Sequence, residues 1–320
     1  GKPVIDFAQA DREMSEAKAA GFKMFVNYNG GILGFDNYFI DENAMRNAGY
    51  DSYTDFLKAV LTVFFALVAH AGANVVNDYY DALNGSDAAN EERIFPFTGG
   101  SRFIQNGVLS LNQTRWLGFA LLISVIPAGL WLTAHSAGGV FVIGLTGLLV
   151  AWAYSAPPLR LMTRGMGEVA IVAGWLMVVV GSDYVQRGTF SMLPLVAGVP
   201  FAMLVAAILF LNQFPDRLAD SRSGKHTLVV RLGTRVARLA YVAWVAGAYS
   251  WLLASVIAQA VPSLGAAGFL AGLLSLKACQ EVVKNGDHPA RLTPAIKATI
   301  AAANLYGLLM AIALVCSISK

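Results

Sequence analysis

Eight apolar runs follow one another along this chain, each long enough or nearly long enough to cross a lipid bilayer. A membrane-spanning helix needs about 20 residues, at about 1.5 Å per residue. Within hydrocarbon the backbone polar groups must be satisfied internally, which favours helices. We therefore predict an all-α integral membrane protein, a multi-pass helical bundle with about eight transmembrane helices. The runs cover residues 56–77, 116–134, 137–154, 166–183, 192–211, 237–258, 262–279 and 296–317.

Composition supports this class and excludes others. The chain of 320 residues is 56% hydrophobic and 13% charged, whereas soluble domains are typically about 25% charged. A net charge of +3 is too small to indicate nucleic acid binding. Cys279 and Cys316 both lie in apolar runs, so neither a disulfide framework nor a cysteine metal site is predicted. The four histidines lack the spacing of a zinc site.

Basic residues predict the orientation. The connections after the first, third, fifth and seventh runs carry many Lys and Arg, whereas the opposite connections carry essentially only Arg187. The positive-inside rule therefore predicts that the basic connections lie in the cytoplasm. We expect the protein to lie in the cell (inner) membrane.

The first residues differ from the rest of the chain. We divide the chain into a polar extramembrane segment, 1–54, and a membrane domain, 55–320; eight spans put 1–54 on the face opposite the basic connections. Because the chain starts at Gly1 and residues 1–54 hold no spanning run, two interpretations stay equal. Either an earlier helix is missing from the sequence, or 1–54 forms a cap with a short amphipathic helix near 9–20.

Two acidic motifs occur where the first and fifth runs reach the basic side. The first motif contains Asn77, Asp78 and Asp81, with Asp87 following after a glycine; the second contains Asn212, Asp216 and Asp220. The pattern N-x3-D thus occurs twice, and residues four apart share one face of a helix. Both motifs are expected to face the cytoplasm.

This pattern favours a divalent cation. Intramembrane carboxylates are costly and are candidates for function, and Mg²⁺ prefers carboxylate oxygens, water and substrate phosphate. No lysine lies within either motif, whereas basic residues follow each one and are suited to contact phosphate. They are Arg93, Arg102, Arg217, Arg222 and Lys225. The competing interpretation, ordinary solvated helix caps, is weakened because two matched motifs face one compartment.

These residues resemble the UbiA superfamily of membrane prenyltransferases, whose signatures are N-D-x-x-D and D-x-x-x-D. The resemblance covers roughly residues 55–317 and is greatest to the menaquinone-type branch, which prenylates dihydroxynaphthoate. Three stretches carry it: Pro96-Phe97-Thr98-Gly99-Gly100-Ser101-Arg102, Tyr154-Ser155-Ala156-Pro157-Pro158-Leu159-Arg160, and the second motif continuing to Gly224-Lys225-His226-Thr227.

The resemblance implies Mg²⁺-dependent transfer of a polyprenyl group from a diphosphate to an aromatic acceptor such as a dihydroxynaphthoate. Its metal ligands are expected to be Asp78, Asp81, Asp87, Asp216 and Asp220. Asn77 and Asn212 are then neutral ligands or orienting groups. Negative charge on the leaving diphosphate is expected to be stabilised by Arg102, Arg160 and Lys225. Substrate binding is assigned to Arg93 and Arg222. Tyr154 is expected to shield an allylic cation. Tyr154 is equally well explained as an interfacial residue.

The chain also departs from that family. The family has nine spans around a central cavity, and the first span is absent here. The resemblance therefore implies a UbiA-like bundle around such a cavity, and we expect a partner subunit, lipid or the segment Phe22–Ile40 to complete its wall. Gln213 and Arg217 stand where this branch often has an acidic and an aromatic residue. Two rival functions stay open: a non-catalytic subunit or lipid- or quinone-binding module, and a transporter. A transporter's acidic residues should lie mid-span.

Overall fold

The structure is a computed structural model and describes residues 52–318. The described residues from Leu61 onward form one compact unit, and the packing described below lies within it. The predictions for the extramembrane segment, a missing helix and Phe22–Ile40 fall outside the described residues.

Residues 52–318 contain helices and turns and no β-strand, which confirms the predicted all-α class. Three short 3₁₀ helices, η1 (Leu161–Arg164), η2 (Ser263–Ala271) and η3 (Pro289–Arg291), lie in connections or lead into the next helix. Eight α-helices are described: α3 (Tyr53–Asn84), α4 (Leu111–His135), α5 (Gly139–Ser155), α6 (Gly167–Arg187), α7 (Met192–Arg222), α8 (Leu228–Ile257), α9 (Gly272–Asn285) and α10 (Thr293–Ile318).

Each predicted run corresponds to a helix. Seven helical segments among the described residues are long and apolar enough to cross a membrane, and α5, with 17 residues, is shorter. The seventh of the eight predicted runs combines η2 with α9. The protein is therefore a multi-pass membrane protein.

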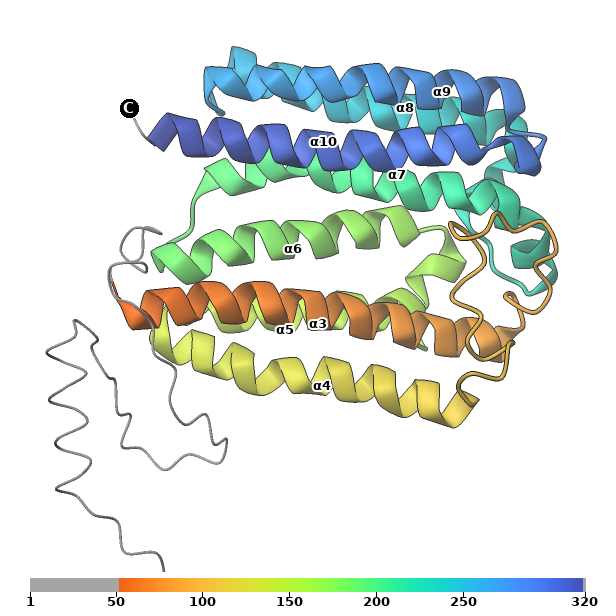
Figure 1. The fold of residues 1–320 in the computed structure, drawn as a ribbon, viewed down its shortest axis with the longest axis horizontal. Coiled ribbons are helices and arrows are strands. Elements are labelled where there is room, and N and C mark those ends of the chain that lie inside the picture. The colour runs from red at the N-terminus through yellow and green to blue at the C-terminus, as the bar shows by residue number, and fades with distance from the viewer. Residues whose placement is uncertain (1–51, 319–320) are drawn as a thin grey trace, which may run out of the picture. The chain divides into compact units, whose positions relative to one another are not determined.

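Among the seven membrane-length segments, α7 is the most buried, and it lies between α6 and α10 (Figure 1). In the apolar 18-residue segment of α7, 44% of the residues are buried, whereas the corresponding share in α3 is 11%. Phe210 and Phe214 of α7 pack with Tyr241 of α8 in the main hydrophobic core. Since α7 continues to Arg222, it carries the second acidic motif as an extension of a tightly packed helix.

Small residues let α3 and α4 approach closely. A Cβ on Gly118 would lie 2.8 Å from Val76 Cγ2, and a Cβ on Gly72 would lie 2.9 Å from Leu122 Cδ2. Close contact through glycine is a common way to pack helices in a membrane, where burial of apolar surface gives little driving force. These contacts fix the helix that carries the first acidic motif.

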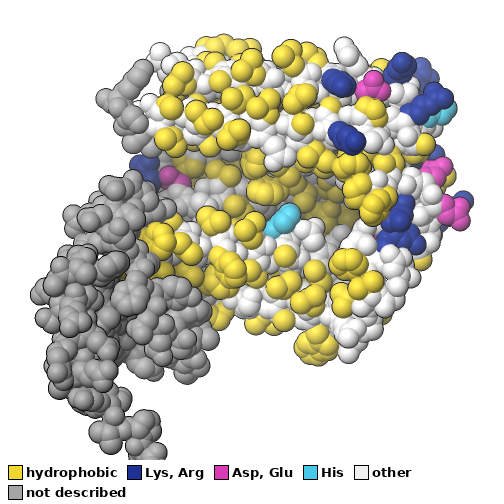
Figure 2. All heavy atoms as spheres, viewed as in Figure 1, with side chains coloured by type: hydrophobic (Ala, Val, Ile, Leu, Met, Phe, Trp, Pro, Cys, Tyr) yellow, Lys and Arg dark blue, Asp and Glu magenta, His cyan; other side chains and the backbone are white. Residues whose placement is uncertain are grey.

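The outer surface suits a lipid environment. Figure 2 shows hydrophobic side chains across the flank of the bundle, with most visible charged side chains gathered at one end. The loop 85–110, drawn in orange, and the C-terminal end of α7 lie at this same end (Figure 1). The two acidic motifs therefore share one end of the bundle.

Candidate active site

The first motif forms the last turns of α3. As predicted from their spacing, Asn77 and Asp81 are neighbours: Asn77 Nδ2 donates to Asp81 Oδ2 at 3.3 Å. The same nitrogen donates to Ser155 Oγ at 3.0 Å. Asn77 thus ties the first motif to the end of α5, next to Tyr154.

The second motif lies on α7, where Asp216 and Asp220 are one turn apart. Directly after this helix, Gly224 adopts a left-handed conformation with φ of +76°, which favours glycine. The chain therefore turns back, and the Lys225 backbone N–H donates to Asp220 O at 2.8 Å. This turn places the Lys225 side chain against the acidic residues.

Lys225 bridges the two motifs. Its Nζ lies 3.0 Å from Asp81 Oδ1 and 3.5 Å from Asp220 Oδ1, and the residue is only 6% exposed. Burial acts to lower the pKa of Lys225, but the two carboxylates outweigh it and raise the pKa above its ordinary value. The sequence showed no lysine within either motif; the fold supplies one from outside both.

Asp87 is the most enclosed carboxylate of the loop 85–110. It is 6% exposed, and burial, together with Asp81, raises the pKa of Asp87 to about 7 against the opposing effect of Lys225. Gly100, with φ of +67°, packs against it so closely that a Cβ there would lie 2.7 Å from Asp87 Oδ2. Arg102 Nη1 donates to the Asp87 carbonyl oxygen at 2.9 Å.

The stretch from Phe97 to Arg102 connects both motifs. Toward the first motif, Ser101 lies near the Asp78 carboxylate and interacts with it. Toward the second, the Phe97 carbonyl oxygen accepts a hydrogen bond from Asn212 Nδ2 at 3.2 Å, and Thr98 contacts Asp216. The sequence singled out this stretch, and the structure gives it a physical role as the strap between the motifs.

The remaining predicted residues differ in how close they lie to the carboxylates. Tyr154 is close enough to Lys225 and Asp81 to interact with them electrostatically. Arg93 stacks over the Phe95 ring at 5.6 Å. Arg160 and Arg222 are exposed, so the structure does not bring their guanidinium groups into the buried cluster.

Glu168 and Gln213 form a buried polar link behind the second motif. Gln213 Nε2 donates to Glu168 Oε1, and Gln213 Oε1 accepts from the Val229 backbone N–H at 3.2 Å. Glu168 is 1% exposed. The link joins α6, α7 and the start of α8, which fixes the end of α7. Glu168 is therefore a polar contact to Gln213.

The carboxylate and amide oxygens near the two motifs are chemically suited to bind a hard cation, but their present positions do not form a ligand shell. Among residues 52–318, no group of three His, Cys, Asp or Glu side chains is close enough to hold a metal ion as it stands. The residues brought near one another are carboxylates and amides, the oxygen donors that Mg²⁺ prefers. The buried amide oxygens of Asn90 and Asn212 also lack hydrogen-bond partners. This donor set fits a divalent cation.

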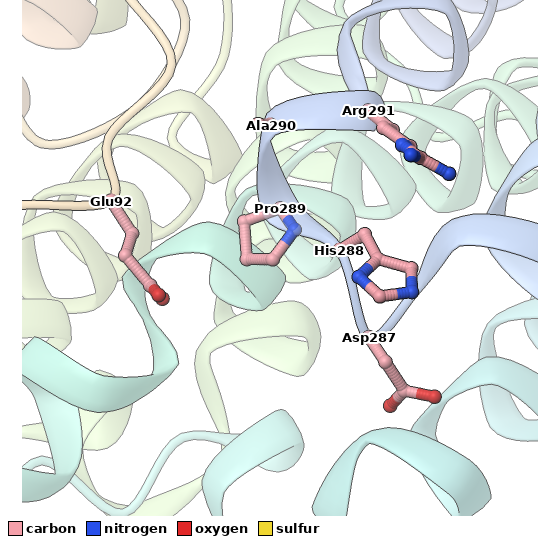
Figure 3. A pocket seen from close by; sticks show the side chains of 6 residues that line it. All are labelled: Glu92, Asp287, His288, Pro289, Ala290 and Arg291. Carbon is pink, nitrogen blue, oxygen red and sulfur yellow. The ribbon is translucent and has the colours of Figure 1, made fainter.

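A surface pocket of about 400 Å³ lies at the connection from α9 to α10. Figure 3 shows Glu92 on one side and Asp287, His288 and Arg291 on the other. Carboxylates and cations line it together, so it offers no single charge to a ligand. None of the predicted site residues lines this pocket.

The composition, the helices and the paired acidic motifs match a known family. A family model described as the UbiA prenyltransferase family matches residues 47–301. The chain belongs to this family. It is therefore a membrane prenyltransferase, and members of this family are generally dependent on divalent metals.

Several characterised relatives carry the same printed name, 1,4-dihydroxy-2-naphthoate octaprenyltransferase. The chain is 27% identical to the protein of Bacillus subtilis, over 82% of this chain and 83% of the relative. It is 28% identical to that of Escherichia coli, over 82% and 85%. It is 30% identical to that of Mycobacterium leprae, over 76% and 79%. The similarity therefore extends over most of each protein.

Proposed function

We propose that this prenyltransferase transfers a polyprenyl group from its diphosphate to a dihydroxynaphthoate, or a closely similar aromatic acceptor, in menaquinone-type quinone biosynthesis. The relatives named above support this acceptor. The observation that carries the chemistry is the Lys225 bridge, because Asp81 and Asp220 belong to motifs 139 residues apart along the chain (220 − 81). Lys225 thus contacts one carboxylate of each motif, which supports the proposal that the two motifs act together.

In this proposal Asp78, Asp81, Asp87, Asp216 and Asp220 hold Mg²⁺, with Asn77 and Asn212 as neutral ligands or orienting groups. The cation, when bound, neutralises charge on the diphosphate. As the C–O bond breaks, its electron pair leaves on the diphosphate. Lys225 and Arg102 carry positive charge at this site and stabilise that developing negative charge.

The acceptor carbon then forms a bond to the allylic carbon. The ring regains its aromaticity when that carbon releases a proton to solvent, or its carboxylate as CO₂, and the electron pair of the broken bond returns to the ring. Tyr154, which interacts electrostatically with Lys225 and Asp81, presents a ring that shields the allylic cation through its π face. Arg93, Arg160 and Arg222 bind the outer part of the diphosphate after the substrate enters. The basic side of the bundle faces the cytoplasm of the cell, from which the diphosphate arrives.

A purified-protein assay tests this proposal. The protein in detergent is given prenyl diphosphates of several lengths with dihydroxynaphthoate, with hydroxybenzoate, or with a naphthoate that lacks hydroxyl groups. Transfer to dihydroxynaphthoate that disappears with EDTA is the expected result. Transfer to none of the acceptors by folded protein would instead favour a non-catalytic subunit or quinone-binding module.

A further inference from the structure

Asn90, in the loop that follows the first motif, makes a direct contact with the second motif. Its Nδ2 lies 2.6 Å from Asp216 Oδ1, and the residue is 6% exposed. An ionised carboxylate only accepts hydrogen bonds, so the atom facing Asp216 must be the amide nitrogen. This contact fixes the orientation of the Asn90 amide group.

The carbonyl oxygen of the same amide has no partner. Asn90 Oδ1 is buried and accepts no hydrogen bond. Buried polar atoms in proteins are almost always paired, and an unpaired one is a reason to look for an absent ion or ligand. Because N and O of one amide are about 2.2 Å apart, this oxygen lies within about 5 Å of Asp216 Oδ1.

The local fold holds Asn90 in this place. Its backbone N–H donates to the Asp87 carbonyl oxygen at 3.4 Å. Gly99, with φ of +79°, passes so close that a Cβ there would lie 3.1 Å from Asn90 Nδ2. The same loop therefore presents Asp87 and Asn90 together, with a glycine that leaves room for the amide.

We propose that Asn90 is a ligand of the divalent cation, its Oδ1 binding the ion that Asp216 holds. The inference rests on the proposed function. Two oxygen ligands of one Mg²⁺ are about 3–4 Å apart, since each lies about 2 Å from the ion. The present separation of at most about 5 Å closes to that value by a small rotation of either side chain. Asn90 then supplies a neutral oxygen that joins the first loop to the second motif.

The affinity of the purified full chain for Mn²⁺ tests this role and needs no enzyme activity. It is measured from the decrease of the electron paramagnetic resonance signal of free Mn²⁺ as the ion binds. Asn90→Ala removes both the oxygen ligand and the donor to Asp216, and we expect affinity to fall about 10-fold or more. Asn90→Asp keeps an oxygen at the same place but cannot donate to Asp216. We expect it to bind Mn²⁺ within about 3-fold of wild type.

The two variants separate a ligand from a structural clamp. If Asn90 served only to orient Asp216, Asn90→Asp and Asn90→Ala would bind Mn²⁺ equally poorly, because both lack the N–H donor to Asp216. That result, or unchanged affinity in Asn90→Ala, overturns the proposal. The exposed Asn106 of the same loop gives a control, since Asn106→Ala should leave affinity unchanged. Thermal unfolding by circular dichroism identifies any variant that fails to fold.

Mn²⁺ binding by wild type, Asp216→Ala and Asn90→Ala distinguishes the role of Asn90 from the metal site as a whole. If wild type binds Mn²⁺ and Asp216→Ala does not, while Asn90→Ala binds normally, the metal site stands and the role of Asn90 falls. If wild type binds no Mn²⁺, the metal assignment and the role of Asn90 fall together.

Discussion

Replacing Lys225 with methionine removes the one ammonium group that lies between Asp81 and Asp220 in the described part of the chain. The two contacts, at 3.0 and 3.5 Å, have a gross Coulomb energy of roughly 10 kcal/mol at an effective dielectric constant of about 20. Desolvation of the buried groups offsets much of this. Removing one partner of a buried ion pair typically costs about 3–5 kcal/mol, because the other charges are left uncompensated.

We therefore expect Lys225→Met to unfold at a markedly lower temperature than wild type when EDTA is present. A divalent cation held by the same carboxylates would replace the lost positive charge. Mg²⁺ should then raise the unfolding temperature of Lys225→Met more than that of wild type. Retention on size-exclusion chromatography after heating in detergent measures both unfolding temperatures.

The same substitution at the exposed Lys284, near the end of α9, is a matched control and should change little. Two results would contradict these expectations for Lys225. An unchanged unfolding temperature of Lys225→Met in EDTA would mean that the bridge does not stabilise the fold. An equal loss with and without Mg²⁺ would mean that no cation replaces the lysine.

Two further predictions concern packing and orientation. Gly118→Ala should destabilise the protein by about 1–3 kcal/mol, because its Cβ would overlap Val76, whereas Gly129→Ala on the same helix meets nothing within 4 Å and should be neutral; thermal unfolding compares them. In a background without the two native cysteines, a membrane-impermeant thiol reagent on intact cells should label Ser15→Cys and spare Ser223→Cys. The reverse pattern would contradict the cytoplasmic placement of the acidic motifs.

Much of the helical arrangement could be predicted from the sequence, because membrane helices are recognised from apolar length alone. The helix boundaries were less predictable where a helix continues into a polar stretch of sequence. The fifth run loses its apolar character after 211, but α7 continues to Arg222. The sixth was expected from 237, but α8 starts at Leu228 and passes through a non-helical glycine, Gly233. Both extensions lie at the charged end of the bundle, where the residues are too polar for hydropathy to indicate a helix.

The residues of the site were predictable as types, but their partners were not. Spacing along one helix correctly indicated the contact of Asn77 with Asp81. The Lys225 bridge depends on a glycine turn and on the packing of two distant helices, which no local pattern reports. Asn90 was missed for the same reason. Its only local signal was a position three residues after Asp87, in a loop whose fold decides what it meets.

Prenyl transfer by Asp81→Ala and Asp216→Ala, each assayed at saturating substrate with Mg²⁺ and with EDTA, tests the claim that both motifs belong to one metal-dependent site. Each variant removes a carboxylate from a different motif. If both motifs act as one metal-dependent site, each variant should lose at least roughly 100-fold in turnover while it still inserts and folds, and wild type should lose activity in EDTA. Turnover at the wild-type rate in either variant would contradict the claim for that motif.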